Sequence, residues 1–586
     1  MSAGTDAAQR AILQRLAEQP LFAGLDGAAL TALAGQMRWI ALGGGQLLFA
    51  QGDASDGLYL LIFGRLAALR READGRCREL GTISPGECVG ETGLMAGEAR
   101  YADVVALRDC ELLFLPRAGF ERLAAQHPEA MLRMVQLVLR RFYATRARPP
   151  PPNCFALLPA TAAVDIDGFA RRFARALGGY ERLQLIGDEA GRDKPPAWFA
   201  EREAANHHLL YVGNADPRWR ERCARQSDCV LLVVDAATEG AAAELLPLPP
   251  RSEHVALDLV LLQRGTPRPG STRHWRARLP AARAHHHVRD DGDLARLVRR
   301  LSGHATGLVL SGGGARGFAH LGAIRALREA GHVFAWIGGA SIGAIVGAGL
   351  AADWNDARLA EVYREYFVAS NPLADWTLPL VALRAGRRVS RRLQAAFGAR
   401  EIDDLPVPFF CVSSNLSDGA LEVHEDGLLW RWLRASSAIP GVLPPVLSAG
   451  RVLVDGGVID NLPVAAMRRR LAGDIVAVDV GGEYRLRGGA DETELPPWWK
   501  LLPELFIARS RPGIGEILLR SGMVNSAATA SRRRKQTRLL LSPPLDGVDL
   551  LDWQAFDRAV AAGYDYTRRE LERASAAGDP VDDAPS

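Results

Sequence analysis

Four consecutive prolines, Pro149 to Pro152, interrupt the chain about a quarter of the way along its 586 residues. Proline lacks a backbone N–H and fixes φ, so this run can neither continue a helix nor pair within a central strand. We therefore expect a stiff linker at 149–152 that closes an N-terminal domain of residues 1–148. The chain is too long for one domain, and we expect two more after the linker, at 153–300 and 301–586.

Hydrophobic periodicity differs between these segments. Residues 40–116 alternate short apolar runs with glycine-containing turns, which is typical of a small β-roll. Between 153 and 300, strand-like apolar runs alternate with helix-like stretches, which predicts a Rossmann-like α/β layer of parallel strands. The segment 301–586 alternates in the same way, so the sequence predicts a multidomain α/β protein with an N-terminal β-roll.

Composition excludes several classes of protein. A net charge of +3 with 24% charged residues gives no reason to expect nucleic-acid binding. Seven cysteines without a Cys-x-x-Cys pair predict neither a disulfide framework nor a zinc ribbon, and they fit a reducing cytoplasm. No apolar stretch reaches the roughly 20 residues that a spanning helix needs, and no secretory signal is visible. We expect a cytoplasmic protein whose membrane contact is peripheral, on the inner face.

A Gly-x-Ser-x-Gly sequence at 339–343 follows a predicted strand at 333–337 and precedes a small-residue helix at 344–352. A serine in a tight strand-to-helix turn needs neighbours without side chains, and the following helix N-terminus stabilises negative charge. This context is that of a nucleophile elbow, so Ser341 is the candidate nucleophile. The bare motif often marks only a tight turn, and its strand and helix neighbours favour catalysis.

A glycine-rich loop at 311–317 follows the buried strand 307–310. Its amides at Gly312, Gly313 and Gly314 could converge on a tetrahedral oxyanion. The same loop also satisfies the weak dinucleotide-binding pattern Gly-x-Gly-x-x-Gly. That pattern expects an acidic residue about 20 positions on, where this chain has the elbow instead. The two motifs together favour an oxyanion hole.

The serine needs a base, and the histidines do not supply one in the usual order. His424 is the only histidine after Ser341, and none follows Asp455. A Ser-Asp-His triad in the α/β-hydrolase order is therefore not expected. Asp455 ends the predicted strand 452–454 and is followed by two glycines, so it is the candidate base of a Ser-Asp dyad. A carboxylate is a weak base toward serine, and we expect burial or hydrogen bonding to raise the pKa of Asp455 by about a unit or more.

These three motifs in this order resemble the patatin-like phospholipases, and most closely the neuropathy target esterase group of lysophospholipases. The resemblance covers most of the chain and includes 219–234, 424–436 and 543–546. It implies a three-layer α/β/α catalytic domain that hydrolyses acyl esters of phospholipids or lysophospholipids. It also implies an acyl-serine intermediate and requires no metal or organic cofactor. Arg316 then either steadies the glycine loop or meets lipid phosphate.

The segment from Glu91 to Arg100 resembles the phosphate-binding cassette of cyclic nucleotide-binding domains. The resemblance implies that Glu91 holds a ribose hydroxyl and that Arg100 pairs with phosphate. Ala99, Tyr101 and Asp103 depart from the pattern, and Asp103 adds negative charge. We expect a β-roll retained without ligand and keep a cyclic nucleotide as the alternative, a regulator of the enzyme. A second alternative for the whole chain is a nucleotide-sensing regulatory protein with an inactive hydrolase domain.

Four other segments carry predictions of their own. The histidines at 285–287 favour a solvated segment over a metal site, because adjacent loop residues cannot all face one ion. The aromatic segment 354–376 is a candidate part of an acyl-chain channel. Residues 498–506 suit either a membrane-interface wedge or core packing. The basic run 532–535 could contact anionic head groups, but we expect it to be ordinary exposed charge.

Overall fold

The computed structural model describes residues 2–22, 25–72, 77–128, 131–133, 135–136, 152–178, 182–236, 244–249, 255–481, 497 and 535–576. The chain forms two compact units, one of residues 1–262 with 281–285 and the other of 263–280 with 286–586. The linker predicted at 149–152 lies outside the described residues except for Pro152, so it stays a prediction.

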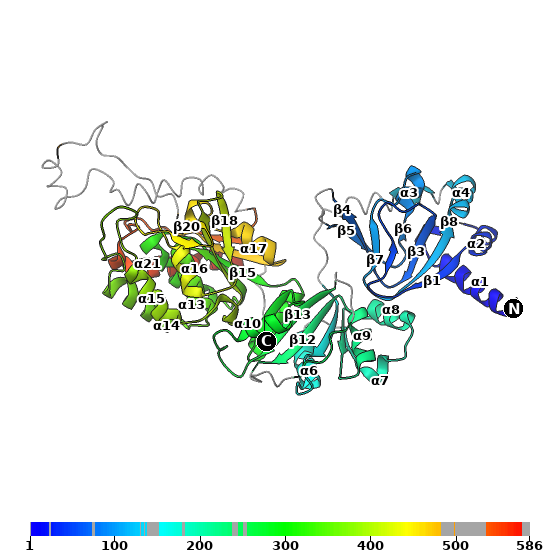
Figure 1. Cartoon of the computed structure of the whole chain (residues 1–586), viewed down its shortest axis with the longest axis horizontal. Helices are drawn as coiled ribbons and strands as arrows, with labels where there is room; N and C mark the ends of the chain where they lie inside the picture. The colour runs from blue at the N-terminus through cyan, green and yellow to red at the C-terminus, as the bar shows by residue number, and fades with distance from the viewer. Residues whose placement is uncertain are drawn as a thin grey trace. The chain divides into compact units, whose positions relative to one another are not determined.

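The N-terminal part of the first unit is a β-roll, as predicted (Figure 1). Its two four-stranded sheets have the orders β1-β8-β3-β6 and β2-β7-β4-β5. The strands are β1 (Arg38–Leu42), β2 (Leu47–Phe49), β3 (Gly57–Phe63), β4 (Leu66–Arg71), β5 (Cys77–Ile83), β6 (Cys88–Val89), β7 (Asp103–Ala106) and β8 (Cys110–Pro116). The helical segments are α1 (Ser2–Ala17), η1 (Pro20–Phe22), α2 (Gly27–Ala34), α3 (Glu91–Ala96) and α4 (Arg117–Gln126). Strand β3 is an almost continuous apolar run because both of its faces are buried. Leu58 and Leu60 pack against the helices on one face, and Leu61 packs between the two sheets on the other.

A six-stranded parallel sheet follows, so the predicted parallel α/β layer is confirmed. Its strands are β9 (Cys154–Pro159), β10 (Leu183–Ile186), β11 (His208–Val212), β12 (Cys229–Asp235), β13 (Ala256–Leu262) and β14 (Ala284–Val288). Its helices are α6 (Ile166–Ala176), α7 (Asp188–Gly191), α8 (Pro196–Ala205) and α9 (Pro217–Arg225). The spatial order is β10-β11-β9-β12-β13-β14. A Rossmann sheet would place β11 at the edge and β10 next to β9, so the two outer strands are exchanged here.

The histidine run belongs to strand β14, which corrects the predicted solvated segment. His286 and His287 are buried, and His287 Nε2 lies 2.8 Å from the carbonyl oxygen of Asp403. Three histidines in a row hid the strand because they give no apolar signal. Among the described residues, no group of three or more His, Cys, Asp or Glu side chains is arranged to hold a metal ion.

The second unit is built on an eight-stranded sheet with the order β19-β20-β17-β16-β15-β21-β22, and β18 pairs with β17. Strands β15, β16, β17, β21 and β22 run parallel, whereas β18 and β20 lie antiparallel to β17 and β19 lies antiparallel to β20. The strands are β15 (Thr306–Leu310), β16 (Phe334–Ala340), β17 (Phe409–Asn415), β18 (Ala420–His424), β19 (Val446–Ser448), β20 (Arg451–Asp455), β21 (Asp474–Val478) and β22 (Leu539–Leu541).

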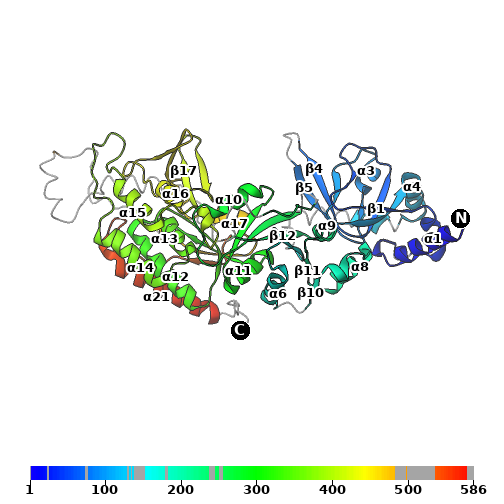
Figure 2. The same ribbon diagram turned by 60° about the horizontal axis from the view of Figure 1, so that its bottom comes forward.

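Helices cover both faces of this sheet, so the predicted three-layer α/β/α domain is confirmed. Leu308 and Leu310 of β15 pack in one core with α12, α13 and α21, whereas Val309 packs in a second core with α17. Helices α12 and α21 run side by side (Figure 2). The helical segments are α10 (Ser271–Arg278), α11 (Asp291–Leu301), η2 (Gly314–Phe318), α12 (Ala319–Glu329), α13 (Ser341–Ala351), α14 (Asp356–Tyr363), η3 (Arg364–Ala369), α15 (Arg387–Phe397), η4 (Ile402–Asp404), α16 (Leu429–Ser436), η5 (Gly456–Val458), α17 (Val464–Arg470), η7 (Trp553–Ala555) and α21 (Phe556–Ala576). No helix in the described part of the chain combines the length and the apolar character needed to cross a membrane.

Candidate active site

The predicted elbow is a tight turn between β16 and α13, and Ser341 is the first residue of the helix. Its backbone has φ +51°, in the left-handed region that side chains disfavour. A methyl group at Gly339 would come within 2.7 Å of the Gly343 carbonyl carbon. One at Gly343 would come within 2.5 Å of the Leu310 carbonyl oxygen. Both glycines are therefore required by the turn, as the motif predicts.

The fold brings Ser341 and Asp455 together across 114 residues of sequence. The Ser341 hydroxyl donates a hydrogen bond of 2.6 Å to Asp455 Oδ2, and the other carboxylate oxygen accepts the Gly457 amide at 2.8 Å. Both side chains are buried. Burial raises the pKa of the Asp455 carboxyl to about 6, although these two hydrogen bonds oppose the rise. The carboxyl therefore changes protonation in the range where a general base is useful.

Two further backbone contacts fix the Ser341–Asp455 pair in place. The Asp455 amide donates to the Ala438 carbonyl at 2.9 Å, just after α16. The Ser341 amide donates to Ser436 Oγ at 3.0 Å. Helix α16 and the residues just after it therefore hold both Ser341 and Asp455. The contact of Ser436 with the elbow is not predictable from the sequence, because no local motif marks a hydroxyl that lies 95 residues further along the chain.

The glycine loop lies directly against Ser341. A methyl group at Gly312 would come within 3.0 Å of Ser341 Cβ, and one at Gly314, where φ is +56°, would collide with the Leu550 carbonyl oxygen. The Gly312 amide donates to the Asn461 carbonyl at 3.2 Å, and Asn461 Nδ2 donates back to the Gly312 carbonyl at 3.1 Å. Because the Gly312 amide is engaged, the amides of Gly313 and Gly314 are the candidates for an oxyanion hole.

Buried side chains hold this loop from behind. His320 Nε2 donates to the Ser311 carbonyl at 2.8 Å, and burial lowers the pKa of His320 to about 4, so the ring is neutral at pH 7. Ser311 Oγ accepts the Val480 amide at 2.9 Å. Arg316 is buried, and its amide donates to the Gly313 carbonyl at 3.2 Å. Its burial favours the loop-steadying role over contact with lipid phosphate.

His424, the one histidine that follows Ser341, is engaged elsewhere. Its Nε2 lies 2.7 Å from Ser413 Oγ, and its ring stacks on Trp432 with centroids 4.2 Å apart. Burial lowers the pKa of His424 to about 4. In a triad, a histidine would lie between the serine and the carboxylate. Here the Ser341 hydroxyl contacts the Asp455 carboxylate directly.

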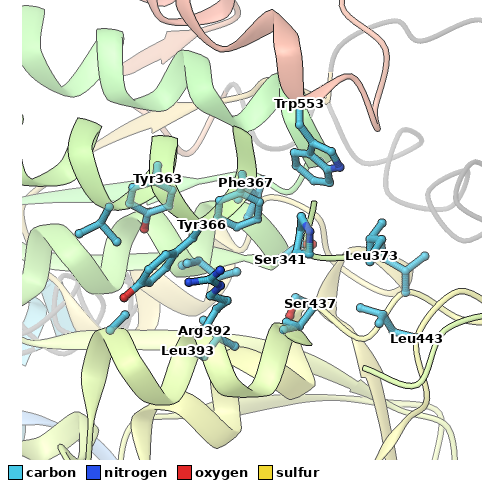
Figure 3. Close-up of a pocket in the computed structure, with 18 of the residues that line it drawn as sticks. Ser341, Tyr363, Tyr366, Phe367, Leu373, Arg392, Leu393, Ser437, Leu443 and Trp553 are labelled. Carbon is cyan, nitrogen blue, oxygen red and sulfur yellow. The ribbon is translucent and has the colours of Figure 1, made fainter. Parts of the chain in front are cut away.

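Ser341 opens into an almost wholly apolar pocket that encloses about 790 Å³ of space, part of it open to solvent (Figure 3). Around the serine, Figure 3 shows Phe367, Leu373, Leu443 and Trp553. The aromatic segment predicted at 354–376 supplies one wall, with Trp354, Val362, Tyr363, Tyr366, Phe367, Pro372 and Leu373. Helix α15 supplies another wall, with Val389, Arg392, Leu393, Ala396 and Phe397. A pocket of this composition suits a hydrocarbon chain.

The two residues predicted to contact a nucleotide are buried in the β-roll, with Glu91 at the start of α3. Arg100 forms an ion pair of 2.5 Å with Asp56 and donates to the carbonyls of Gly57 and Gly90. Its guanidinium also lies 4.2 Å above the centre of the Phe49 ring. The charge that would meet a phosphate is therefore already neutralised by a carboxylate.

Two sequence predictions lie outside the described residues. These are the aromatic segment 498–506 and the arginines 532–534 of the basic run.

Comparison with protein families divides the chain as follows. Residues 40–127 match the cyclic nucleotide-binding domain, 153–304 match the neuropathy target esterase family P-loop like domain, and 308–468 match the patatin-like phospholipase family. These matches confirm the predicted resemblance to the neuropathy target esterase group of patatin-like proteins. The group's P-loop like domain corresponds to the parallel sheet with exchanged outer strands.

The chain is similar to two curated fungal proteins named lysophospholipase NTE1. It is 30% identical to that of Coccidioides immitis, over 96% of this chain and 43% of the relative. It is 27% identical to that of Saccharomyces cerevisiae, over 92% of this chain and 41% of the relative. The chain thus spans less than half the length of these relatives. Among solved structures, it is similar to the regulatory subunit of a cAMP-independent protein kinase A from Trypanosoma brucei, with 23% identity, a TM-score of 0.23, and coverage of 25% of this chain and 53% of that one.

Proposed function

We propose that this chain is a serine esterase that hydrolyses acyl esters of phospholipids or lysophospholipids. The observation that carries the proposal is the 2.6 Å hydrogen bond from the Ser341 hydroxyl to a buried Asp455, where Ser341 lines an apolar pocket. The names of the curated relatives support the substrate class. Residue types and geometry thus agree on acyl transfer to serine.

In the first half of the reaction, the Asp455 carboxylate accepts the proton from Ser341 as Oγ attacks the ester carbonyl. The amides of Gly313 and Gly314 and the N-terminus of α13 stabilise the negative charge that develops on the carbonyl oxygen. When the tetrahedral intermediate collapses, Asp455 returns the proton to the departing alcohol. An acyl-serine remains, with its hydrocarbon chain in the apolar pocket.

In the second half, Asp455 accepts a proton from a water molecule as that water attacks the acyl-serine. Collapse of the second intermediate breaks the acyl–Oγ bond, and the proton returns to Ser341. The fatty acid leaves and the enzyme is restored. These steps use only groups of the chain and one water molecule, so the proposal requires no cofactor.

We further propose that the protein acts on the inner face of a membrane, in a reducing compartment. All seven cysteines are free, which supports such a compartment. The engaged state of Arg100 supports a β-roll that works without a nucleotide ligand.

The test is covalent labelling with a fluorophosphonate, followed by hydrolysis of a lysophospholipid panel. We expect the wild-type chain to be labelled, the Ser341→Ala variant to be unlabelled, and both Ser341→Ala and Asp455→Asn to lose hydrolysis. The matched control is Ser437→Ala, a second pocket serine whose hydroxyl donates to the Leu433 carbonyl. Labelling that persists in Ser341→Ala, or activity that survives in Asp455→Asn, refutes the mechanism. An unlabelled wild-type chain that binds a cyclic nucleotide tightly by calorimetry favours the sensor alternative.

A further inference from the structure

The six residues 376–381, here called the apolar loop, expose an unusual amount of hydrocarbon. Trp376, Leu378, Leu380 and Val381 are each at least 70% exposed. Single exposed apolar residues are ordinary on a soluble protein, but four within six residues form a patch of the kind that marks an interaction site.

The base of the apolar loop is fixed to the rest of the catalytic unit. The Ala385 amide donates to the Asp375 carbonyl at 2.8 Å, and the Thr377 amide donates to the Leu383 carbonyl at 3.3 Å. The guanidinium carbon of Arg384 lies 3.2 Å from the centre of the Trp376 ring. These contacts close a short hairpin, so its apolar tip is held out toward solvent.

The apolar loop also lies at the rim of the catalytic pocket. Leu373 before it and Val389 after it both line that pocket. The Leu383 amide donates to the Gly441 carbonyl at 2.9 Å, two residues before Leu443, which also lines the pocket. A surface that contacts the loop is therefore next to the route by which a lipid chain would reach Ser341.

Immediately after the loop lies a groove lined by Arg387 and Arg391 of α15 and by Arg431 and Arg434 of α16, here called the arginine groove. In the described part of the chain, no carboxylate forms an ion pair with any of these four arginines. Arg434 is only 5% exposed, and its Nη1 has no hydrogen-bond partner among the described residues. A buried guanidinium with an unused donor, beside three more cations, favours an anionic group with several oxygens.

We propose that the apolar loop and the arginine groove dock the catalytic unit on an anionic lipid bilayer. The loop enters the head-group region, where tryptophan is favoured, and the groove binds lipid phosphate. Stable attachment to a membrane generally takes two signals, and an apolar insertion next to clustered cations supplies both. The inference rests on the proposed function, because it gives the esterase direct access to its substrate at the pocket rim.

The experiment measures co-flotation of the full chain with phosphatidylcholine vesicles, with and without phosphatidylglycerol. All proteins carry Ser341→Ala, so binding does not depend on turnover. Leu380→Asp is compared with Val333→Asp, an exposed apolar residue just before the start of β16. We expect Leu380→Asp to weaken vesicle binding at least about tenfold and Val333→Asp to leave it unchanged. Unfolding midpoints confirm that both variants are folded.

The charge contribution is measured separately. The double variant Arg387→Gln with Arg391→Gln is compared with Arg325→Gln with Arg573→Gln, which removes equal charge from exposed positions on α12 and α21. We expect each arginine of the groove to contribute about fivefold to the preference for anionic vesicles, and the control pair to contribute little.

Equal flotation of the Leu380→Asp and Val333→Asp proteins overturns the proposal, and so does an equal anionic preference in the two double variants. A dimer seen by sedimentation that Leu380→Asp abolishes, without vesicle binding by the parent, shows a protein interface instead. Fluorophosphonate labelling separates this proposal from the esterase proposal. If the wild-type chain is labelled but its Ser341→Ala form does not float, docking alone is overturned. If the Ser341→Ala form floats but the wild-type chain is never labelled, the esterase alone is overturned.

Discussion

Asp455→Asn removes the charge of the candidate base while keeping its shape. The amide oxygen can still accept the Gly457 N–H, and the NH₂ group can donate to Ser341 Oγ, so both hydrogen bonds of the wild type have counterparts. The substitution therefore isolates the effect of a buried carboxylate. We expect the variant to lose about 10²- to 10⁴-fold in kcat and, at neutral pH, to be more stable than the wild type.

The expected gain in stability follows from the pKa of Asp455. Burial raises this pKa from 3.8 to about 6, and each pKa unit corresponds to about 1.4 kcal/mol. The native state therefore holds the proton more tightly than the unfolded state. Wild-type stability falls as pH rises from about 4 to about 6, and the total loss is about 3 kcal/mol. Asparagine has no proton to release in this range, so the variant avoids that loss.

The assay is the unfolding midpoint of the catalytic unit at a series of pH values. Above pH 6 we expect Asp455→Asn to unfold roughly 6 °C higher than the wild type, and below pH 4 the difference should vanish. Ser341→Ala is the control, because loss of the hydroxyl donor raises the Asp455 pKa further and steepens the pH dependence. A difference between Asp455→Asn and wild type that is the same at pH 4 and pH 8 refutes the argument from burial.

Three further predictions concern pH, the glycine loop and the β-roll. Esterase activity should rise through an apparent pKa of about 6 as Asp455 ionises, and initial rates between pH 4 and 8 measure this directly. Gly314→Ala should abolish activity and lower the unfolding midpoint, because its methyl group meets the Leu550 carbonyl; a soluble, fully active variant contradicts this close packing of the loop. By calorimetry the wild-type chain should bind cAMP weakly or not at all, and Asp56→Ala should strengthen binding by freeing Arg100; an unchanged affinity shows that the ion pair is not what limits it.

Local motifs were sufficient to predict the elements that carry the site. A buried strand, a glycine loop and a Gly-x-Ser-x-Gly turn each require particular residue types, and these can be recognised within a stretch of about ten residues. The structure accordingly places Ser341 at the start of α13 and Asp455 at the end of β20, both as expected. The pairing of the two could be inferred only from the order of the motifs, since no spacing rule links residues so far apart.

Contacts between distant segments account for what the sequence did not predict. Ser436 and Asn461 meet the dyad and the glycine loop through side chains and carbonyls that no periodicity marks. Strand β14 was missed because the histidines at 285–287 give a polar signal, although two of them are buried by packing. Trp376 ends the segment 354–376 that was predicted to line a channel, yet it is exposed, because an aromatic residue gives the same signal in a core and on a surface loop. In each case, tertiary packing determines the contacts or the burial of the residue, and the local sequence pattern does not reveal them.

The left-handed backbone at Ser341 affects which inactive variant of this chain is the most stable. A side chain in that conformation costs roughly 1–2 kcal/mol, which glycine would recover. Ser341→Gly should therefore give a sturdier inert protein than Ser341→Ala, and so a better trap for a bound lipid. An inactive hydrolase domain would also gain stability by replacing this serine with glycine. This chain keeps the serine.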